Sequence, residues 1–192
     1  MRLKNSKADS KIEDYSLEEH QRRFSVWAAF AATRRGVKSY SLKNIHFWLD
    51  KIDFEKLLAA RSCKKFDELH KIAREDFVKL SNVSHGRAAK ILNIYLKAQL
   101  PIFFSKNPKL EEYIHPPLDR LLLEAISQKY KTECKCYRQN FPQEKNEKKL
   151  DPLSWSKFSC KQYEAAIKLV RNCVKEEPLW KIEYLWDGLK EN

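Results

Sequence analysis

Residues 80–97 read Leu80-Ser-Asn-Val-Ser-His-Gly-Arg-Ala-Ala-Lys-Ile-Leu-Asn-Ile-Tyr-Leu-Lys97. Apolar side chains from Ala88 onward cover more than half of a helical circumference, which predicts a central, largely buried helix capped by Ser84. Gly86, one of only three glycines in the chain, lies at its N-terminus, where free backbone N–H groups and the helix dipole favour an anion. The residues left to face solvent are Arg87, Lys90, Asn93 and Lys97.

A second apolar segment, His115-Pro-Pro-Leu-Asp-Arg-Leu-Leu-Leu-Glu-Ala-Ile126, follows a loop expected to begin where Pro101 ends the preceding helix. Pro117 suits the first turn of another buried helix, and Asp119 then lies in that turn. A carboxylate in a first turn is stabilised by the helix dipole whether or not it acts on a ligand. The position alone therefore leaves a structural role and a catalytic role open for Asp119.

Helical spacing of apolar residues recurs along most of the chain, and no strand-like alternation appears between turn signals. The sequence predicts an all-α helical bundle and leaves open whether it forms two lobes with a cleft. Over residues 65–80 the predicted buried stripe includes Ile72 and Leu80, and the charged face opposite is expected to be wet. The expected divisions are a mobile arm at 1–15, a main helical domain at 16–128, a poorly packed basic connection at 129–152, and C-terminal helices at 153–192 that pack back on the main domain.

The chain has 192 residues and a net charge of +12, which favours a polyanionic partner, with nucleic acid the leading candidate. A lysine-rich surface that only improves solubility is the alternative explanation of this charge. No run of 18 apolar residues is present, so no membrane span is expected. Five cysteines without a regular framework suit a reducing cytoplasm, and Cys134-Lys-Cys136 lacks a second pair at zinc-ligand spacing, so neither metal nor cofactor is expected.

Together, residues 80–97 and 113–126 resemble the helix-hairpin-helix DNA glycosylase superfamily over about a quarter of the chain. In that family a Leu-Pro-Gly-Val-Gly hairpin leads into a helix, and a later Pro-Val-Asp begins the helix that bears the catalytic aspartate. Here Asn82 and Ser84 replace the two hairpin glycines. Asn tolerates a left-handed backbone and Ser can cap a helix, so the turn is expected to persist. The segment is also similar to small helical bacterial proteins without an established activity.

The resemblance implies excision of a damaged or modified base from duplex DNA after the nucleotide is flipped out of the stack. Asp119 would stabilise the positive charge that grows on the sugar, and Lys90 is the nearest substitute for the lysine of bifunctional members, whose position falls on Gly86. The resulting catalytic residues are Asp119 and Lys90, and the expected nucleic-acid contacts are Ser84, His85, Gly86, Arg87, His115 and Arg120.

Two other functions stay open at the level of sequence. The first is a non-catalytic basic module that binds nucleic acid, as part of a larger assembly or a defence system. The second is a protein-interaction scaffold whose charge is incidental. Replacement of the hairpin glycines favours a non-catalytic module, whereas the Pro116-Pro-Leu-Asp119 turn favours the enzyme.

Overall fold

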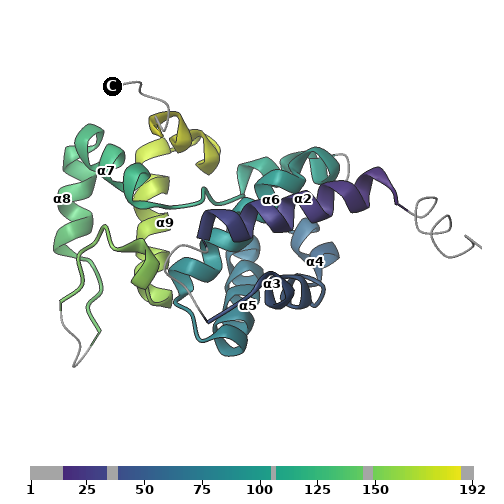
Figure 1. The fold of residues 1–192 in the computed structure, drawn as a ribbon. Coiled ribbons are helices and arrows are strands. Elements are labelled where there is room, and N and C mark those ends of the chain that lie inside the picture. The colour runs from purple at the N-terminus through teal and green to yellow at the C-terminus, as the bar shows by residue number, and fades with distance from the viewer. Residues whose placement is uncertain (1–14, 34–38, 105–106, 145–148, 187–192) are drawn as a thin grey trace, which may run out of the picture.

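The computed structural model describes residues 15–33, 39–104, 107–144 and 149–186, and over these residues the protein is an all-α helical bundle without strands (Figure 1). The expected mobile arm, apart from Tyr15, lies outside the described residues. Within the described part, every helix is too short or too polar to span a lipid bilayer. The elements are α2 (Leu17–Thr33), α3 (Leu42–Leu49), α4 (Phe54–Leu58), α5 (Cys63–Ser81), α6 (His85–Phe104), η1 (Pro108–Glu112), α7 (Arg120–Lys129), α8 (Lys131–Gln139), η2 (Trp155–Lys157), α9 (Cys160–Val174) and η3 (Leu179–Leu185).

The buried side chains form two hydrophobic cores that meet at α6. The first core is built by α2 to α6 with η1, and the second by α7, α8, α9 and η3. Ala89 of α6 packs in the second core, while its neighbour Ala88 packs in the first. Figure 1 shows α7 to α9 on one side of the molecule and α2 to α5 on the other. The central helix predicted over residues 85–97 therefore joins the two halves of the fold.

Local capping explains where several helices begin. Ser41 and Ser159 each form a capping box with the residue three positions later. The Ser84 hydroxyl accepts a hydrogen bond from the Arg87 amide at 3.2 Å. Asn82 takes a left-handed conformation with φ of 48° and ends α5. The predicted cap at Ser84 is confirmed, and Asn82 takes the left-handed conformation expected at the position where the glycosylases carry a hairpin glycine.

Two helix boundaries differ from the prediction. Pro101 lies inside α6, which continues to Phe104, because Phe103 is buried and its ring packs 5.9 Å from that of Phe54, holding the last turn in place. Asp119 is the N-cap of α7 and does not lie within its first turn, since helical conformation begins at Arg120.

Residues 129–152 are not simply a poorly packed connection. Residues 131–139 form α8, and its apolar side chains Cys134 and Tyr137 are buried in the second core together with Phe141. These three apolar side chains, among many charged ones, are enough to hold a short amphipathic helix against the second core. The C-terminal η3 packs mainly in this second core as well, through Leu179 and Ile182.

Helix α5 is rotated relative to the predicted apolar stripe. Ile72 and Leu80 are 55% and 42% exposed, whereas His70 and Arg74 are 0% and 2% exposed. The charged face of α5 was expected to be wet, and part of it is instead turned toward α9. Asn93 of α6, expected at the surface, is also fully buried. The reason is a shared set of hydrogen bonds that these polar side chains can make only inside the protein.

Asn93 is the centre of this buried polar network between the two cores. Its amide nitrogen donates to the Pro116 carbonyl and to the Tyr163 hydroxyl, both at 3.0 Å, and its amide oxygen lies 2.7 Å from His70 Nε2. The Arg74 Nε–H donates to His70 Nδ1 at 3.1 Å, so Nε2 must carry the proton of a neutral His70. Burial lowers the pKa of His70 well below its ordinary value, which agrees with this tautomer.

The same reasoning fixes the protonation of His115. The Tyr163 hydroxyl already accepts from Asn93, so its proton points to His115 Nδ1 at 3.0 Å, and His115 Nε2 donates to Asp67 Oδ1 at 2.8 Å. Burial lowers the pKa of His115, although Asp67 acts in the opposite direction. Both buried histidines are therefore neutral in the folded chain.

Acidification should destabilise the protein through these two histidines. A histidine whose pKa is lower in the folded chain binds fewer protons there than in the unfolded chain. Its contribution to the free energy of unfolding is complete above the ordinary pKa of 6.5 and is lost as the pH falls below 6.5 toward the folded value. We expect the free energy of unfolding, measured by chemical denaturation, to fall between about pH 7.5 and about pH 5.

The His70→Gln variant should show a shallower pH dependence than the wild type over this range. His46→Gln, on α3, is the matched control and should keep the wild-type slope. Asp67 loses its own stabilising contribution only below its ordinary pKa of 3.8, as the pH approaches its folded pKa of about 2, so it does not interfere. A free energy of unfolding that is independent of pH in this window would contradict a neutral network.

Candidate active site

The structure brings Lys90 and Asp119 together although they lie 29 positions apart in the chain. Lys90 Nζ lies 3.4 Å from Asp119 Oδ2, and the two side chains are only 11% and 18% exposed. Lys90 projects from the middle of α6, and Asp119 caps the start of α7. An amine and a carboxylate thus share one partly buried site.

This ion pair lines a pocket of about 500 Å³, which we call the Lys90 pocket. Its walls come from both halves of the fold: α2 supplies Ala28 and Ala32, and Trp186 follows η3. The small alanine side chains leave space that larger residues would fill. Drug-sized ligands occupy pockets of roughly 300–1,000 Å³, so the Lys90 pocket can hold a small molecule or one nucleotide. Its remaining lining residues are Ile94, Lys97, Ala98, Pro117, Leu122 and Glu183.

The net effect of the surroundings of Lys90 is to lower the pKa of its amine. Burial lowers the pKa of Lys90, while the charge of Asp119 and its hydrogen bond partly offset this effect. The face of the Trp155 ring lies 4.5 Å from Lys90 Nζ and also attracts the charged form. A lysine with a lowered pKa is a better nucleophile near neutral pH than an exposed lysine.

Asp119 uses its two carboxylate oxygens for different purposes. Oδ1 accepts a hydrogen bond from the Leu122 amide at 2.9 Å and thereby caps α7, while Oδ2 faces Lys90. The capping role explains why an acidic residue is suitable at this position without any chemistry. Because Oδ2 faces Lys90 in the pocket while Oδ1 forms the cap, Asp119 can cap α7 and also act on a ligand.

The N-terminus of α6, expected to hold phosphate, is occupied by the chain itself. The Gly86 amide donates to the Phe158 carbonyl at 3.1 Å, and the Ser84 hydroxyl donates to the Ser156 carbonyl at 2.7 Å. A Cβ atom added to Gly86 would lie 1.8 Å from the Trp155 carbonyl oxygen, so glycine is needed for the close approach of η2. His85, beside them, is half-buried, and its Nδ1 has no hydrogen-bond partner among the described residues. The Gly86 amide and the Ser84 hydroxyl therefore bond to carbonyls of the protein and are not free to bind phosphate.

Arg87 lies one turn before Lys90 and borders the site. Its Nη1 donates to the Thr33 carbonyl at the end of α2 at 3.2 Å, where a cation also suits the helix dipole. Together with Trp155, Arg87 lines a second pocket of about 410 Å³ that shares Ala32 with the Lys90 pocket. Arg87 therefore stands next to the Lys90–Asp119 pair but is held in place by a protein carbonyl.

The other two predicted contacts lie away from the Lys90 pocket. His115 is 3% exposed and bonded to Tyr163 and Asp67, so it supports the fold from within and lies at the base of a different pocket. The side chain of Arg120 is 71% exposed and pairs with Glu124 at 2.6 Å on the surface of α7. Of the predicted set, the structure brings together Lys90 and Asp119, with Arg87 beside them.

Sequence reasoning missed several polar residues that shape the interior. They are Asp67, His70, Arg74, Tyr163 and Arg171. Asp67, His70 and Arg74 recur at three- and four-residue spacing on α5, the same period as the apolar stripe beside them. This spacing shows that the three polar residues share one face of α5. It does not distinguish a buried polar face from one exposed to solvent.

Comparisons with protein-family models, with curated proteins and with solved structures find no match to this chain. The function assigned to the site therefore rests on its geometry and on the chemistry of its residues.

The two roles of Asp119 can be separated by substitution. Asp119→Asn should retain the N-cap, because Asn caps helices as well as Asp does, and should remove only the charge. Asp119→Ala should lose the cap in addition and be less stable than Asp119→Asn by about 1 kcal/mol, or about 2–4 °C in thermal unfolding of a chain of this size. Equal melting temperatures for the two variants would show that the cap contributes nothing measurable.

Proposed function

We propose that this protein is a DNA glycosylase-like enzyme that binds duplex DNA and excises a damaged or modified base. The observation that carries the proposal is the convergence of Lys90 and Asp119 at 3.4 Å in a partly buried pocket. The resemblance of residues 80–97 and 113–126 to the helix-hairpin-helix glycosylases singles out the same two residues, and their proximity is independent of that resemblance.

In this mechanism the flipped nucleotide enters the Lys90 pocket with C1′ of its sugar facing the Lys90–Asp119 pair. Asp119 Oδ2 stabilises the positive charge that develops at C1′ as the bond to the base breaks. The neutral amine of Lys90 attacks C1′, and the base leaves with the electrons of the C1′–N bond and takes up one of the two amine protons. The C1′–O4′ bond then breaks as the second amine proton passes to O4′, which opens the sugar and leaves a Schiff base between Lys90 and C1′. The lowered pKa of Lys90 favours this step because only the free amine is nucleophilic.

Charge and exposed aromatic rings support nucleic acid as the ligand. The chain carries a net charge of +12, and Arg87 and Lys97 lie on either side of Lys90 along α6. On α2, Phe24 and Trp27 are 51% and 57% exposed, and Phe24 lies one turn before the pocket residue Ala28. Exposed aromatic side chains provide stacking surfaces for unpaired bases. Cations on α6 and exposed rings on α2 are therefore available on the two helices that supply residues to the Lys90 pocket.

A non-catalytic module that binds nucleic acid is the second candidate, and a specific observation favours it. Backbone amides at the start of a helix are the usual phosphate contacts of such a motif, and here the Gly86 amide bonds to Phe158. Without this phosphate contact, the protein holds the DNA backbone less firmly, and positioning one nucleotide for base excision becomes harder. The two candidates differ in whether any base is released.

Base release from duplexes that each carry one modified base should depend on Asp119. We expect the wild type to release at least one base of such a panel, measured by strand cleavage at the resulting abasic site after alkali. Asp119→Asn should release it about 100-fold more slowly or worse, because the charge that stabilises the transition state is gone while the cap of α7 remains. Its affinity for DNA should be unchanged or higher.

Glu124→Gln is the matched control, since it removes the same charge from α7 outside the pocket, and it should keep the wild-type rate. Equal rates for wild type and Asp119→Asn would overturn the catalytic assignment. Binding of every duplex without release, weakening steeply with salt, would favour the non-catalytic module.

Lys90 should form a covalent adduct with DNA that contains an abasic site when borohydride is present. Lys90→Ala should abolish the adduct, and Lys161→Ala, which removes an exposed lysine of α9 outside the Lys90 pocket, should retain it. In Asp119→Asn the pKa of Lys90 should be lower still, because the carboxylate that raises it is lost, so trapping should extend to lower pH. An adduct that persists in Lys90→Ala would assign the nucleophile elsewhere.

A further inference from the structure

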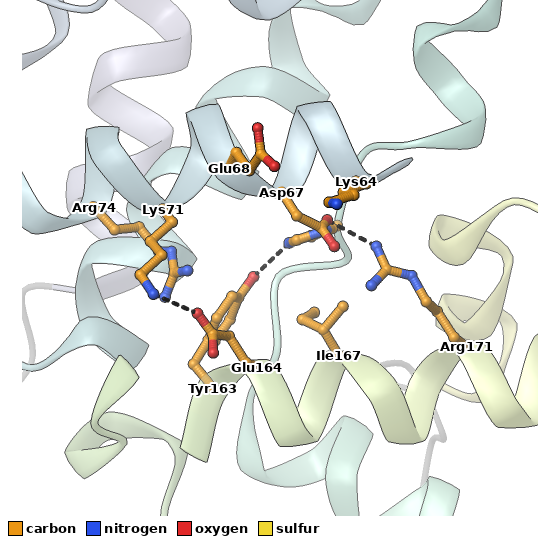
Figure 2. Close-up of a pocket in the computed structure, with 10 residues that line it drawn as sticks. Lys64, Asp67, Glu68, Lys71, Arg74, Tyr163, Glu164, Ile167 and Arg171 are labelled. Carbon is orange, nitrogen blue, oxygen red and sulfur yellow. Dashed lines mark hydrogen bonds and ion pairs between the residues drawn. The ribbon is translucent and has the colours of Figure 1, made fainter. Parts of the chain in front are cut away.

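A pocket of about 370 Å³, separate from the two described above, lies between α5 and α9, and we call it the Arg74 pocket (Figure 2). None of its lining residues lines the Lys90 pocket, and it meets the buried network through Tyr163, which accepts from Asn93. Its lining is mostly charged, with side chains from both halves of the fold: Lys64, Asp67, Glu68, Lys71, Arg74, His115, Tyr163, Glu164, Ile167 and Arg171.

Arg74 is the unusual member of this pocket because it is a buried cation that pairs with no carboxylate of the part of the chain that the structure describes. It is 2% exposed, its Nε donates to neutral His70, and its guanidinium lies 4.3 Å from the centre of the Tyr163 ring. Its Nη1 is buried and has no hydrogen-bond partner among the described residues. Figure 2 shows the side chain reaching from α5 toward Tyr163. A buried charge is costly unless an opposite charge and hydrogen bonds compensate it, so this guanidinium is suited to receive an anion.

The nearby carboxylates do not fill that role because they are already paired. Asp67 accepts from both Arg171 and His115 at 2.8 Å, and these contacts outweigh burial and lower its pKa to about 2. Glu164 pairs with Lys71 at 3.3 Å across the pocket, and both of these side chains are nearly half exposed. A surface pair of this kind is weak, so an incoming anion can replace Glu164 as the partner of Lys71.

The acidic residues also restrict what the ligand can be. A simple anion would be repelled by Glu68 and Glu164, whereas a molecule that carries hydroxyl groups beside its anionic group can donate hydrogen bonds to them. The pocket is larger than a single phosphate needs and lies in the size range of small-molecule sites. Both properties fit a phosphorylated sugar.

We propose that the Arg74 pocket binds the phosphate monoester of a sugar, with the phosphate on Arg74 and Lys71 and the hydroxyl groups on Glu68 and Glu164. Guanidinium and ammonium groups together form the strong, charge-assisted hydrogen bonds that phosphate prefers. The sugar phosphate is either a free metabolite-sized molecule or the terminal nucleotide of a nucleic-acid strand, and both present the same chemistry. This site does not depend on base excision in the Lys90 pocket.

The test is whether ribose 5-phosphate binds to the 192-residue protein. Binding is measured by titration calorimetry and by the shift in melting temperature, both at constant ionic strength. We expect saturable binding, with inorganic phosphate weaker and ribose without effect. A short single-stranded oligonucleotide with a 5′-phosphate, compared with the same strand without it, distinguishes the two sources. A preference for the phosphorylated strand over ribose 5-phosphate would assign the site to strand ends, and the reverse to free sugar phosphates.

Arg74→Met should weaken ribose 5-phosphate binding at least ten-fold. The variant loses a buried cation and also the hydrogen bond to His70 Nδ1, so its melting temperature without ligand is measured alongside to establish that it is folded. Lys71→Met gives a second measurement on a more exposed residue and should weaken binding as well. Lys79→Met, on the exposed side of α5, is the matched control and should bind as the wild type does. Absence of saturable binding in the wild type, or equal affinity in wild type, Lys71→Met and Arg74→Met, would overturn the proposal.

Discussion

The arrangement of both pockets depends on the buried amide of Asn93. Its three hydrogen bonds tie α6 to His70 of α5, to Tyr163 of α9 and to the Pro116 carbonyl that precedes α7. An unpaired amide is costly in a low-dielectric interior. The helices α5, α6 and α9 and the segment before α7 therefore fit together in one alignment, because any other alignment would break several of these hydrogen bonds. The apolar contacts of the two cores hold the helices together, and the amide fixes how they are aligned.

This alignment explains how two distant residues form one site. Lys90 and Asn93 lie about one turn apart on α6: Lys90 lines its pocket, while Asn93 is buried against Tyr163, which lines the Arg74 pocket. The bond from Asn93 to the Pro116 carbonyl fixes the segment just before Asp119, and the two prolines limit its backbone freedom further. Asp119 is consequently held beside Lys90 by the same helix that carries Lys90. The pair needs no additional element to set its distance.

The features that the sequence predicts correctly are those determined by near neighbours. The caps at Ser41, Ser84 and Ser159 depend on residues three positions away, and the all-α class follows from apolar spacing within each helix. The burial of Asn93 depends instead on partners 23 and 70 positions away, and the covering of Gly86 depends on Phe158 in a distant turn. A single sequence carries no record of such pairings, so the Lys90–Asp119 pair could be suggested by resemblance while the Arg74 pocket could not be predicted at all.

The closed N-terminus of α6 changes how this protein can attract a phosphate backbone. Backbone amides at a helix start are fixed in direction and insensitive to pH, but here the Gly86 amide already bonds to the Phe158 carbonyl. In the proposed enzyme, attraction at the Lys90 pocket would then come from side-chain cations on α6, which are screened by salt and, for Lys90, lost on deprotonation. The protonated lysine would bind phosphate and the neutral lysine would act as the nucleophile, so Lys90 could serve both functions only near its own pKa. The Asp119 carboxylate raises that pKa against the effect of burial, and under this proposal it would set the balance between binding and chemistry.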